Sequence, residues 1–253
     1  MLPAAAMAEV PVLDVFSVRL ATYFTQLDTV ARVEGSVIDS GTDIDLQRDL
    51  GLKSSEAIAF AQVDWRPWAH HGFGVSYFNN SRSSNRTLQR DIIFEGQDFP
   101  AGSRVRTELE MEGYEMHYVF WAWQKENWAL GPRVGLVYYD IGLSLEVEQT
   151  TAVNRADANS GVPAPSIGFD WRWRPADDWR IYASAGVFNA TINDVDGSVA
   201  VGQIGVEWFP WERFGVYLDY SRNKIDVNLD RRDYRGSLEL DDSGARTGII
   251  FRF

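Results

Sequence analysis

The sequence lacks cysteine, long apolar runs and any excess of positive charge, and each lack narrows the function. Cysteine is absent from all 253 residues, so the chain suits an oxidising compartment, where stray disulfides would otherwise form. No stretch approaches the ~18 consecutive apolar residues of a transmembrane helix, which excludes a helical span. The net charge of −12 argues against nucleic acid as a partner, because phosphate binding needs a basic surface.

Aromatic residues, in contrast, are abundant. Phe, Tyr and Trp make up 13% of the chain, and charged residues make up 24%. A soluble protein can carry this mixture, and so can a β-barrel with an apolar outer face, because its polar lumen and loops balance that face. A strand crosses a bilayer with only about 9–11 alternating residues, so the absence of a helical span leaves a membrane barrel open.

The last eight residues, 246–253, alternate between two faces. Phe253, Phe251, Ile249, Thr247 and Ala245 share one face, which is the period-two pattern of a strand with one apolar side. The segment resembles the closing strand of Gram-negative outer-membrane β-barrels, whose signature is a polar residue, a Gly two positions later and two spaced apolar residues ending in Phe. The matching residues are Arg246, Gly248, Phe251 and Phe253.

This resemblance implies a transmembrane antiparallel up-and-down β-barrel, porin-like in architecture, in the bacterial outer membrane. The four matching residues would be an assembly signal read by the barrel-assembly machinery. Outer-membrane lipid and lipopolysaccharide would surround the barrel. The motif identifies no subfamily and no oligomeric state.

Four compact turns share one chemistry, in which Pro or polar residues stand between aromatic flanks. Pro, Asp and Asn suit turns because they fix φ or tolerate tight dihedrals. Trp suits a membrane–water interface because its apolar ring has a polar edge. We therefore predict that these turns form the short periplasmic rim of a barrel; the alternative is four soluble hairpins with Trp in a core. The turns span 65–72, 123–128, 173–179 and 208–214.

Longer acidic segments rich in Ser, Asn and Gly separate the turns and are predicted to be extracellular loops. They span 35–56, 82–103, 149–163, 190–198 and 225–243. About ten strands remain, with eight or twelve as alternatives, in a single domain over 9–253. Residues 1–8 are predicted to be the remnant of an export signal, because Ala6-x-Ala8 suits signal peptidase. The predicted strands span 12–34, 56–66, 72–81, 104–123, 128–148, 164–174, 179–190, 199–209, 214–225 and 244–253.

Within these strands charged residues fall on the face opposite the aromatic residues, as in strand 164–174. In an outer-membrane barrel the charged face lines the lumen. A narrow barrel is filled by its side chains, and opposite charges would pair there, so we predict a structural ion-pair plug. The alternative is a polar conduit or ligand site. The predicted lumen residues are Asp64, Arg66, Glu115, His117, Arg133, Asp170, Arg172, Arg180, Glu207, Asp219, Arg246 and Arg252.

Signals for chemistry are weak. Glu115 and His117 share one strand face, as in a carboxylate–imidazole dyad, but no matching nucleophile accompanies them. The Ser-His-Glu set of lipid A deacylases and the Asp-His set of omptin proteases are both missing at matching positions. The calcium-loop-like start at Asp226 has Arg231 where Gly is required, so no metal site and no cofactor is predicted. We therefore expect a non-enzymatic envelope barrel that is structural or partner-binding. A small-solute channel, a lipid- or peptide-active enzyme and a soluble lipocalin-like barrel are the alternatives.

Overall fold

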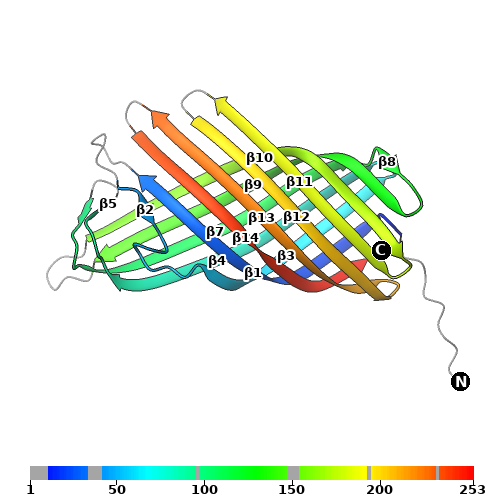
Figure 1. Ribbon diagram of the computed structural model, residues 1–253, viewed down its shortest axis with the longest axis horizontal. Coiled ribbons are helices and arrows are strands. Elements are labelled where there is room, and N and C mark those ends of the chain that lie inside the picture. Colours follow the sequence, from blue (N-terminus) through cyan, green and yellow to red (C-terminus); the bar gives the residue numbers. More distant parts are fainter. Residues whose placement is uncertain (1–10, 34–41, 95–96, 148–153, 193–194, 232–233) are drawn as a thin grey trace, which may run out of the picture.

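The strands of the protein close into one barrel in the computed structural model (Figure 1). The structure describes residues 11–33, 42–94, 97–147, 154–192, 195–231 and 234–253, so the predicted signal remnant at 1–8 lies outside the described residues. Within these ranges, no helix is long and apolar enough to cross a membrane.

Ten antiparallel strands form the wall, and each pairs with its neighbours in sequence. β14 pairs with β1 from Ser17↔Arg252 to Val33↔Gly236 and so closes the barrel. The predicted up-and-down topology and strand number are confirmed. Short extra strands are β2 (Ile44–Asp45), β5 (Ile92–Phe94), β6 (Gln97–Phe99) and β8 (Trp123–Gln124). The wall strands are β1 (Phe16–Val33), β3 (Ser55–Trp68), β4 (His71–Thr87), β7 (Arg104–Phe120), β9 (Trp128–Val147), β10 (Asn154–Ala176), β11 (Trp179–Ile192), β12 (Val195–Trp211), β13 (Phe214–Arg231) and β14 (Tyr234–Arg252).

The apolar face of each strand points outward. Ile167 is 61% exposed and Leu218 is 54% exposed, whereas the intervening Asp170 and Asp219 are buried. A soluble barrel would have the opposite arrangement, because its core lies inside. Exposed aromatic rings border this apolar belt at both edges, as at membrane interfaces. They are Trp65, Trp68, Trp123, Trp179, Trp208 and Trp211 at the short turns, and Tyr77, Tyr114, Tyr138 and Tyr220 at the other edge.

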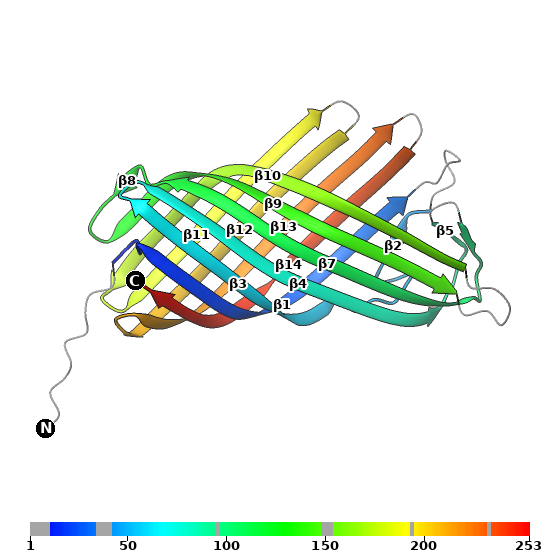
Figure 2. The same ribbon diagram turned by 180° about the vertical axis from the view of Figure 1, so that it is seen from behind.

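The strands continue beyond the second aromatic rim, toward the end that carries β2 and β5 (Figures 1 and 2). β10 begins at Asn154, and β13 and β14 run through most of 225–243. The segments 149–163, 190–198 and 225–243, predicted as loops, are therefore largely strand. Their polar composition misled the prediction, because above the belt the outward face of a strand meets water and carries charges such as Glu110 and Lys224.

The extended wall divides into two groups of strands. Pairing of β10 with β11 ends at Ile167↔Val187, and β11–β14 diverge from β9 and β10 above that point (Figures 1 and 2). There β10 pairs with β9 alone and contains Pro163 and Pro165. Successive N–H groups of a strand point to opposite edges, so Pro163 and Pro165, two residues apart, both lack the N–H of the same edge. Proline is tolerated at an edge that pairs with no other strand, because no hydrogen bond is lost there. The local sequence thus favours an unpaired edge on β10.

A second separation lies between β3 and β4, whose pairing ends at Phe60↔Phe78. The chain after β2 fills it. Arg82 donates hydrogen bonds from Nη1 to the carbonyl oxygens of Lys53 and Ser54, and Ser84 Oγ donates to that of Leu50 (2.5 Å). Side chains of β4 therefore replace the missing strand ladder on this side.

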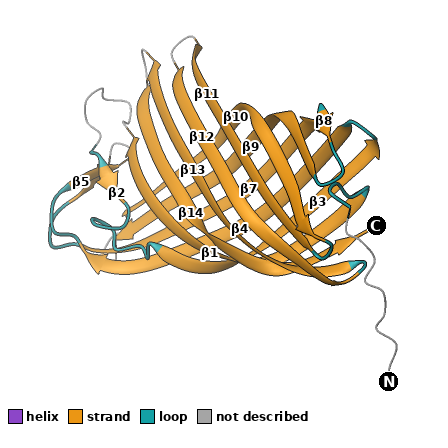
Figure 3. Ribbon diagram, turned by 45° about the vertical axis from the view of Figure 1, so that its right-hand side comes forward, coloured by secondary structure: helices purple, strands orange, loops and turns teal. Residues whose placement is uncertain are grey.

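The extracellular half of the lumen is mainly apolar, and its buried Asp242 accepts hydrogen bonds from Tyr23 Oη (3.0 Å) and Thr25 Oγ1 (2.5 Å). Leu46, Leu50, Ile92 and Phe94 from the two long connections are buried there against inward-facing residues of the wall, such as Leu109. These connections lie at the β2–β5 end in Figure 3. Although predicted only as acidic loops, the described parts of these connections, 42–54 and 88–94, fold back and cover this end of the barrel.

Candidate functional site

Arg19 is the centre of the ion-pair network in the other half of the lumen. It lies on β1, where Phe16, Val18 and Leu20 point outward and alternation turns Arg19 inward. Its guanidinium contacts Asp64 of β3 and, at 2.6 Å from Nη2 to Oε1, Glu207 of β12. This side chain therefore joins strands on opposite sides of the barrel.

Arg180 continues the chain of ion pairs toward the periplasmic opening. Its Nε lies 2.5 Å from Glu207 Oε2, and its Nη2 lies 2.6 Å from Asp14 Oδ2. The side chains of Arg180 and Glu207 are fully buried. Burial of these charges is tolerated because each meets two opposite charges.

The segment 11–15 precedes β1 and closes the periplasmic opening. It was predicted as the start of a strand, but it turns across the mouth because arginines bind its carbonyl groups. Arg180 Nη1 donates to Pro11 O (3.2 Å), and Arg66 donates to the carbonyl oxygens of Leu13 and Asp14. Val12 is buried with Val119, Trp121 and Ala129.

A second cluster joins β7, β9 and β10. Arg133 contacts Glu115, and its Nη1 lies 3.6 Å from Asp170 Oδ1. His117 lies between the clusters, with Nε2 3.4 Å from Asp64 Oδ1 and Nδ1 3.9 Å from Glu115 Oε1. This contact passes over Gly74 of β4, where a Cβ would lie 2.2 Å from the imidazole.

A third cluster lies nearer the apolar half. Arg246 Nε is 2.7 Å from Asp219 Oδ1, and Tyr182 Oη donates to Asp219 Oδ2 (2.6 Å). The Arg246 guanidinium also lies 4.4 Å from the centre of the Phe60 ring, a cation–π geometry. At this cluster the polar network therefore meets the aromatic residues of the apolar core.

The structure brings most of the predicted lumen residues together, and two of them lack ion pairs. Arg66 binds backbone carbonyl groups at the mouth, and Arg172 has no carboxylate within ion-pair distance among the described residues. Prediction from sequence missed Arg19 and Asp14. The alternation that identified Asp170 applies equally to Arg19. Asp14 falls on the outward face of the predicted strand 12–34, and it was missed because the chain turns across the mouth before β1 begins at Phe16. The paired residues are Asp64, Glu115, His117, Arg133, Asp170, Arg180, Glu207, Asp219, Arg246 and Arg252.

The residues of the C-terminal motif have different surroundings. Arg246 points into the lumen, whereas Phe251 and Phe253 are exposed at the short-turn rim. Phe253 exchanges backbone hydrogen bonds with Phe16, at 2.8 and 3.2 Å. The two aromatic residues thus lie at the seam between the first and last strands.

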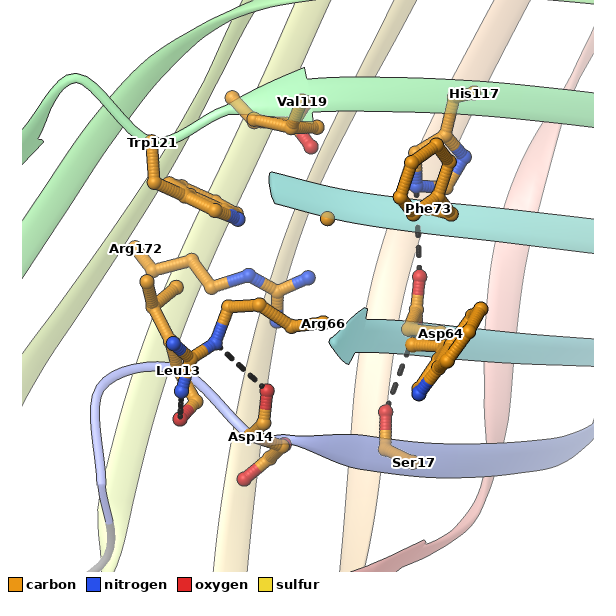
Figure 4. A pocket seen from close by; sticks show the side chains of 13 residues that line it. Leu13, Asp14, Ser17, Asp64, Arg66, Phe73, His117, Val119, Trp121 and Arg172 are labelled. Atoms are coloured by element: carbon orange, nitrogen blue, oxygen red, sulfur yellow. Dashed lines mark hydrogen bonds and ion pairs between the residues drawn. The ribbon is translucent and has the colours of Figure 1, made fainter. Parts of the chain in front are cut away.

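The lumen retains little free space. A cavity of about 40 Å³ lies between Asp64, His117, Trp121 and Arg172 (Figure 4), and one of about 20 Å³ lies beside Glu115 and Arg133. A larger open hollow of about 410 Å³ lies at the periplasmic end, between segment 11–13 and the turn at 124–126. Among the residues that the structure describes, no group of three His, Cys, Asp or Glu side chains could hold a metal ion.

Outside the membrane, an ion cluster holds the connection after β2. Arg90 Nη2 lies 2.5 Å from Asp49 Oδ2, and Arg48 Nε lies 3.1 Å from Asp49 Oδ1. Burial acts to raise the pKa of Asp49, but the hydrogen bonds from Arg90 and Arg48 outweigh it and lower the pKa to about 2. Asp49 is therefore ionised at neutral pH and fixes this connection over the barrel.

No family model and no curated protein matches the sequence. Solved structures match its fold. The outer-membrane protease OmpT of Escherichia coli superposes with a TM-score of 0.62 at 10% identity, covering 94% of this chain and 96% of OmpT. The translocator domain of the autotransporter NalP from Neisseria meningitidis gives a TM-score of 0.50 at 12% identity, covering 94% and 88%. The fold is that of Gram-negative outer-membrane β-barrels, and together with the apolar belt it places the protein in that membrane.

Proposed function

We propose that this protein is a non-conducting, non-enzymatic outer-membrane barrel that binds another component of the cell envelope. The binding part is its extracellular extension, which is the portion of the strands beyond the rim of Tyr77, Tyr114, Tyr138 and Tyr220. The observation that carries the proposal is the filling of the lumen along its whole length. Segment 11–15 covers the periplasmic mouth, the Arg19–Glu207–Arg180 ion pairs cross the middle, and the apolar cluster closes the extracellular half.

The size of the remaining cavities supports a plug over a channel. A single water molecule needs roughly 10–15 Å³ of free volume, so cavities of about 40 and 20 Å³ hold a few waters or a small ion. A conducting pore requires a continuous aqueous path. The network instead neutralises charges on opposite walls directly against each other.

The surroundings of His117 favour a structural role over catalysis. Both ring nitrogens face carboxylates, and Ser17 and Ser76 are directed at Asp64 and Glu115 rather than at the imidazole. The two other histidines of the sequence, His70 and His71, lie at a short periplasmic turn. The extracellular extension thus lacks the histidine that an Asp-His site requires.

Partner binding by the extension is supported by its open strand edges. β10 above Ile167 and β11 above Val187 each pair on one side only, and such edges accept an additional strand or must be shielded from one. Water-facing charges on its outer surface also suit contact with another protein. The extension, unlike the filled lumen, is therefore accessible to a partner.

Planar-bilayer recordings test the non-conducting function. The purified barrel is expected to give no discrete current steps at ±100 mV, while a general porin in the same bilayers gives them. The matched variants are R19A/E207A, which removes the central ion pairs, and R222A, which removes an exposed arginine. Discrete steps from the unaltered protein would refute the proposal, whereas steps from R19A/E207A alone would support the ion pairs as the seal.

Photo-crosslinking on intact cells tests partner binding. A crosslinking residue at the exposed Ser83 on β4, above the belt, is expected to capture an envelope protein, and one at the lipid-facing Leu218 is expected not to. Equal labelling at both positions, or none at Ser83 and at further exposed sites of the extension, would contradict partner binding.

A further inference from the structure

The upper part of β11 has a free edge that faces the gap between β10 and β11. β11 stays paired with β12 as far as Ile192↔Val195, whereas its pairing with β10 ends at Ile167↔Val187. Above that point the two strands diverge (Figures 1 and 2). The segment Phe188–Ile192 therefore has a strand partner on one side only among the described residues.

The backbone groups that face this gap belong to Asn189 and Thr191. In an antiparallel sheet the N–H and C=O of one residue point to the same edge, and those of the next residue point to the other edge. The carbonyl oxygen of Ala185 is directed at Gly168 of β10, so the odd-numbered residues of β11 face β10. Asn189 and Thr191 thus direct two N–H and two C=O groups into the gap. Within the described ranges, no backbone hydrogen bond reaches them there.

The other open edges are protected, but this one is not. Pro163 and Pro165 have the parity of the β10 residues that face β11, so the opposite side of the gap lacks two donors. The separation between β3 and β4 is filled by the chain after β2. The stretch Val187–Ile192 contains no proline and no charged residue, which are the usual protections of a natural edge. An unprotected edge beside protected ones suits the addition of a strand.

The inner face beside this edge is apolar. Phe188 is half-buried and packs against the apolar cluster of the extracellular half. Val199, its cross-strand neighbour on β12, is buried, and so is Ala164 of β10. Because side chains alternate along a strand, every second residue of an added strand would point toward this surface. Those residues are expected to be apolar.

The outer face carries acidic residues on both sides of the gap. Asp196 of β12 is exposed and lies opposite Thr191. On the other side, Asp140 of β9 is exposed and lies opposite Gly161 of β10, with Glu112 of β7 as its next neighbour. The outward side chains of an added strand would lie between these carboxylates. Lysine or arginine at those positions would complement the charge.

A second copy of this protein does not fit the edge. The strands of outer-membrane barrels tilt by about 35–45° from the membrane normal. Two copies in one membrane are related by a twofold axis along that normal, so their β11 strands would cross at roughly 70–90° instead of lying side by side. The added strand therefore belongs to a different protein.

We infer that the free edge of β11 binds an extended segment of another envelope protein as an added antiparallel strand. The residues of this segment alternate between apolar side chains toward the lumen and basic side chains toward water. Antiparallel pairing is the more stable kind per residue and matches the rest of the wall. The inference rests on the proposed function, because it names the surface of the extension that holds the partner and the chemistry of the partner's segment.

A synthetic peptide, Lys-Val-Lys-Val-Lys-Val-Lys with blocked ends, tests the edge on the full chain in lipid nanodiscs. Hydrogen exchange followed by NMR is expected to show slower exchange at the Asn189 and Thr191 amides when the peptide is added. In antiparallel register the lysines are the residues that bond to β11, since their side chains share the outward face with Asn189. N-methylation of an inner lysine should therefore weaken binding about tenfold, because one hydrogen bond is lost and a methyl group meets the edge. N-methylation of the central valine, whose N–H points away from β11, should leave binding unchanged.

Two results of this experiment would overturn the inference. One is equal binding of the two N-methylated peptides, and the other is no protection of Asn189 and Thr191 at millimolar peptide. A peptide with glutamate in place of lysine tests the charge argument, and it is expected to bind more weakly than the lysine peptide at low salt. Equal binding of the two would contradict the basic character of the partner.

Variants of Asn189 provide the second test. N189P removes an N–H that faces the gap and leaves the ladder with β12 intact, whereas N189T keeps the N–H and is the matched control. Heat-modifiable gel mobility shows whether both fold. N189P is expected to bind the lysine peptide about tenfold more weakly than N189T does. Equal affinities would count against the edge as the binding site.

Photo-crosslinking from Ser83 on intact cells separates this inference from the proposed function. Capture of an envelope protein that is lost in N189P and kept in N189T would support the inference. Equal capture in both variants would leave partner binding in place and exclude the β11 edge as its site. Failure of Ser83 and of further exposed sites to capture any protein would contradict the proposed function, and the peptide experiment would still decide whether the edge accepts a strand.

Discussion

Replacement of Arg19 by methionine removes the cation that Asp64 and Glu207 share, and its cost follows from the remaining contacts. Breaking a buried ion pair costs about 3–5 kcal/mol, because the partner is left charged in a medium of low polarity. Here Glu207 keeps Arg180 at 2.5 Å, and Asp64 keeps the Gln62 amide at 2.9 Å and His117 at 3.4 Å. We therefore expect a loss near the lower limit, about 3 kcal/mol of unfolding free energy.

Urea unfolding of the barrel in lipid vesicles, followed by tryptophan fluorescence and by heat-modifiable gel mobility, measures this loss. R222M is the matched control, since Arg222 forms an exposed pair with Asp241 on β13 and β14 and such pairs contribute little. R222M should unfold with the unaltered protein, and R19M at a clearly lower urea concentration. If R19M and R222M unfolded together, Arg19 would not be the centre of the network.

Three further predictions concern close packing, acidity and the open strand edge. Gly74→Ala places a Cβ against the His117 ring and should cost about 1–3 kcal/mol in the same assay. Adding His117→Ala should restore much of this loss, and a double variant no more stable than G74A would contradict the packing argument. The pKa of Asp49 is lower in the folded protein than in the unfolded chain, so its stabilisation is complete above about pH 4 and is lost as pH falls toward 2. Hydrogen exchange at 45–52 should accelerate over that window in the unaltered protein, whereas D49N should exchange fast at all pH values; an identical pH profile for both would refute it. P163T/P165T restores two N–H donors to the free edge of β10 and should increase self-association in light scattering, and unchanged monomer content would count against the edge-blocking role.

The spacing of turns and polar segments predicted the barrel and its strand number, and the alternation of residues predicted which side chains share a face. In β10 and β13 a single register divides the chain into lipid-facing residues such as Phe169 and Leu218 and lumen residues such as Asp170 and Asp219. Period-two patterning carries this information because a strand has only two faces. The C-terminal motif and the aromatic rims then decided which face is inside.

The ends of the strands were not predictable from composition. Polar residues at 225–243 indicate a loop in a soluble protein, but above a membrane belt they indicate a strand with one face in water. Folding of the two long connections into the lumen was also missed. The sequence did contain a signal for this folding, because large apolar residues in an otherwise acidic segment are expected to be buried against another surface. These residues are Leu46, Leu50 and Phe94.

The sequence predicted which charged residues face the lumen, but it did not predict which of them contact one another. Sequence alternation places Asp64 and Glu207 inside, yet only the barrel's closure brings them to Arg19 across the lumen. Gly74 shows the same limit, because the His117–Asp64 contact that passes over it joins residues of β7 and β3. Contacts across a lumen depend on strand stagger, which a single sequence does not reveal.

The closed lumen is tested most directly by cysteine accessibility, which the natural absence of cysteine makes clean. Ser76→Cys, Ser166→Cys and Ser221→Cys each place a thiol at a buried, inward-facing position at a different point around the barrel, and Ser83→Cys places one on the water-facing surface. In vesicles, a small charged thiol reagent should label S83C rapidly and the three lumen variants far more slowly, from either side of the membrane. Lumen thiols that react as fast as S83C would mean that water fills the barrel, and the plug would have to be abandoned.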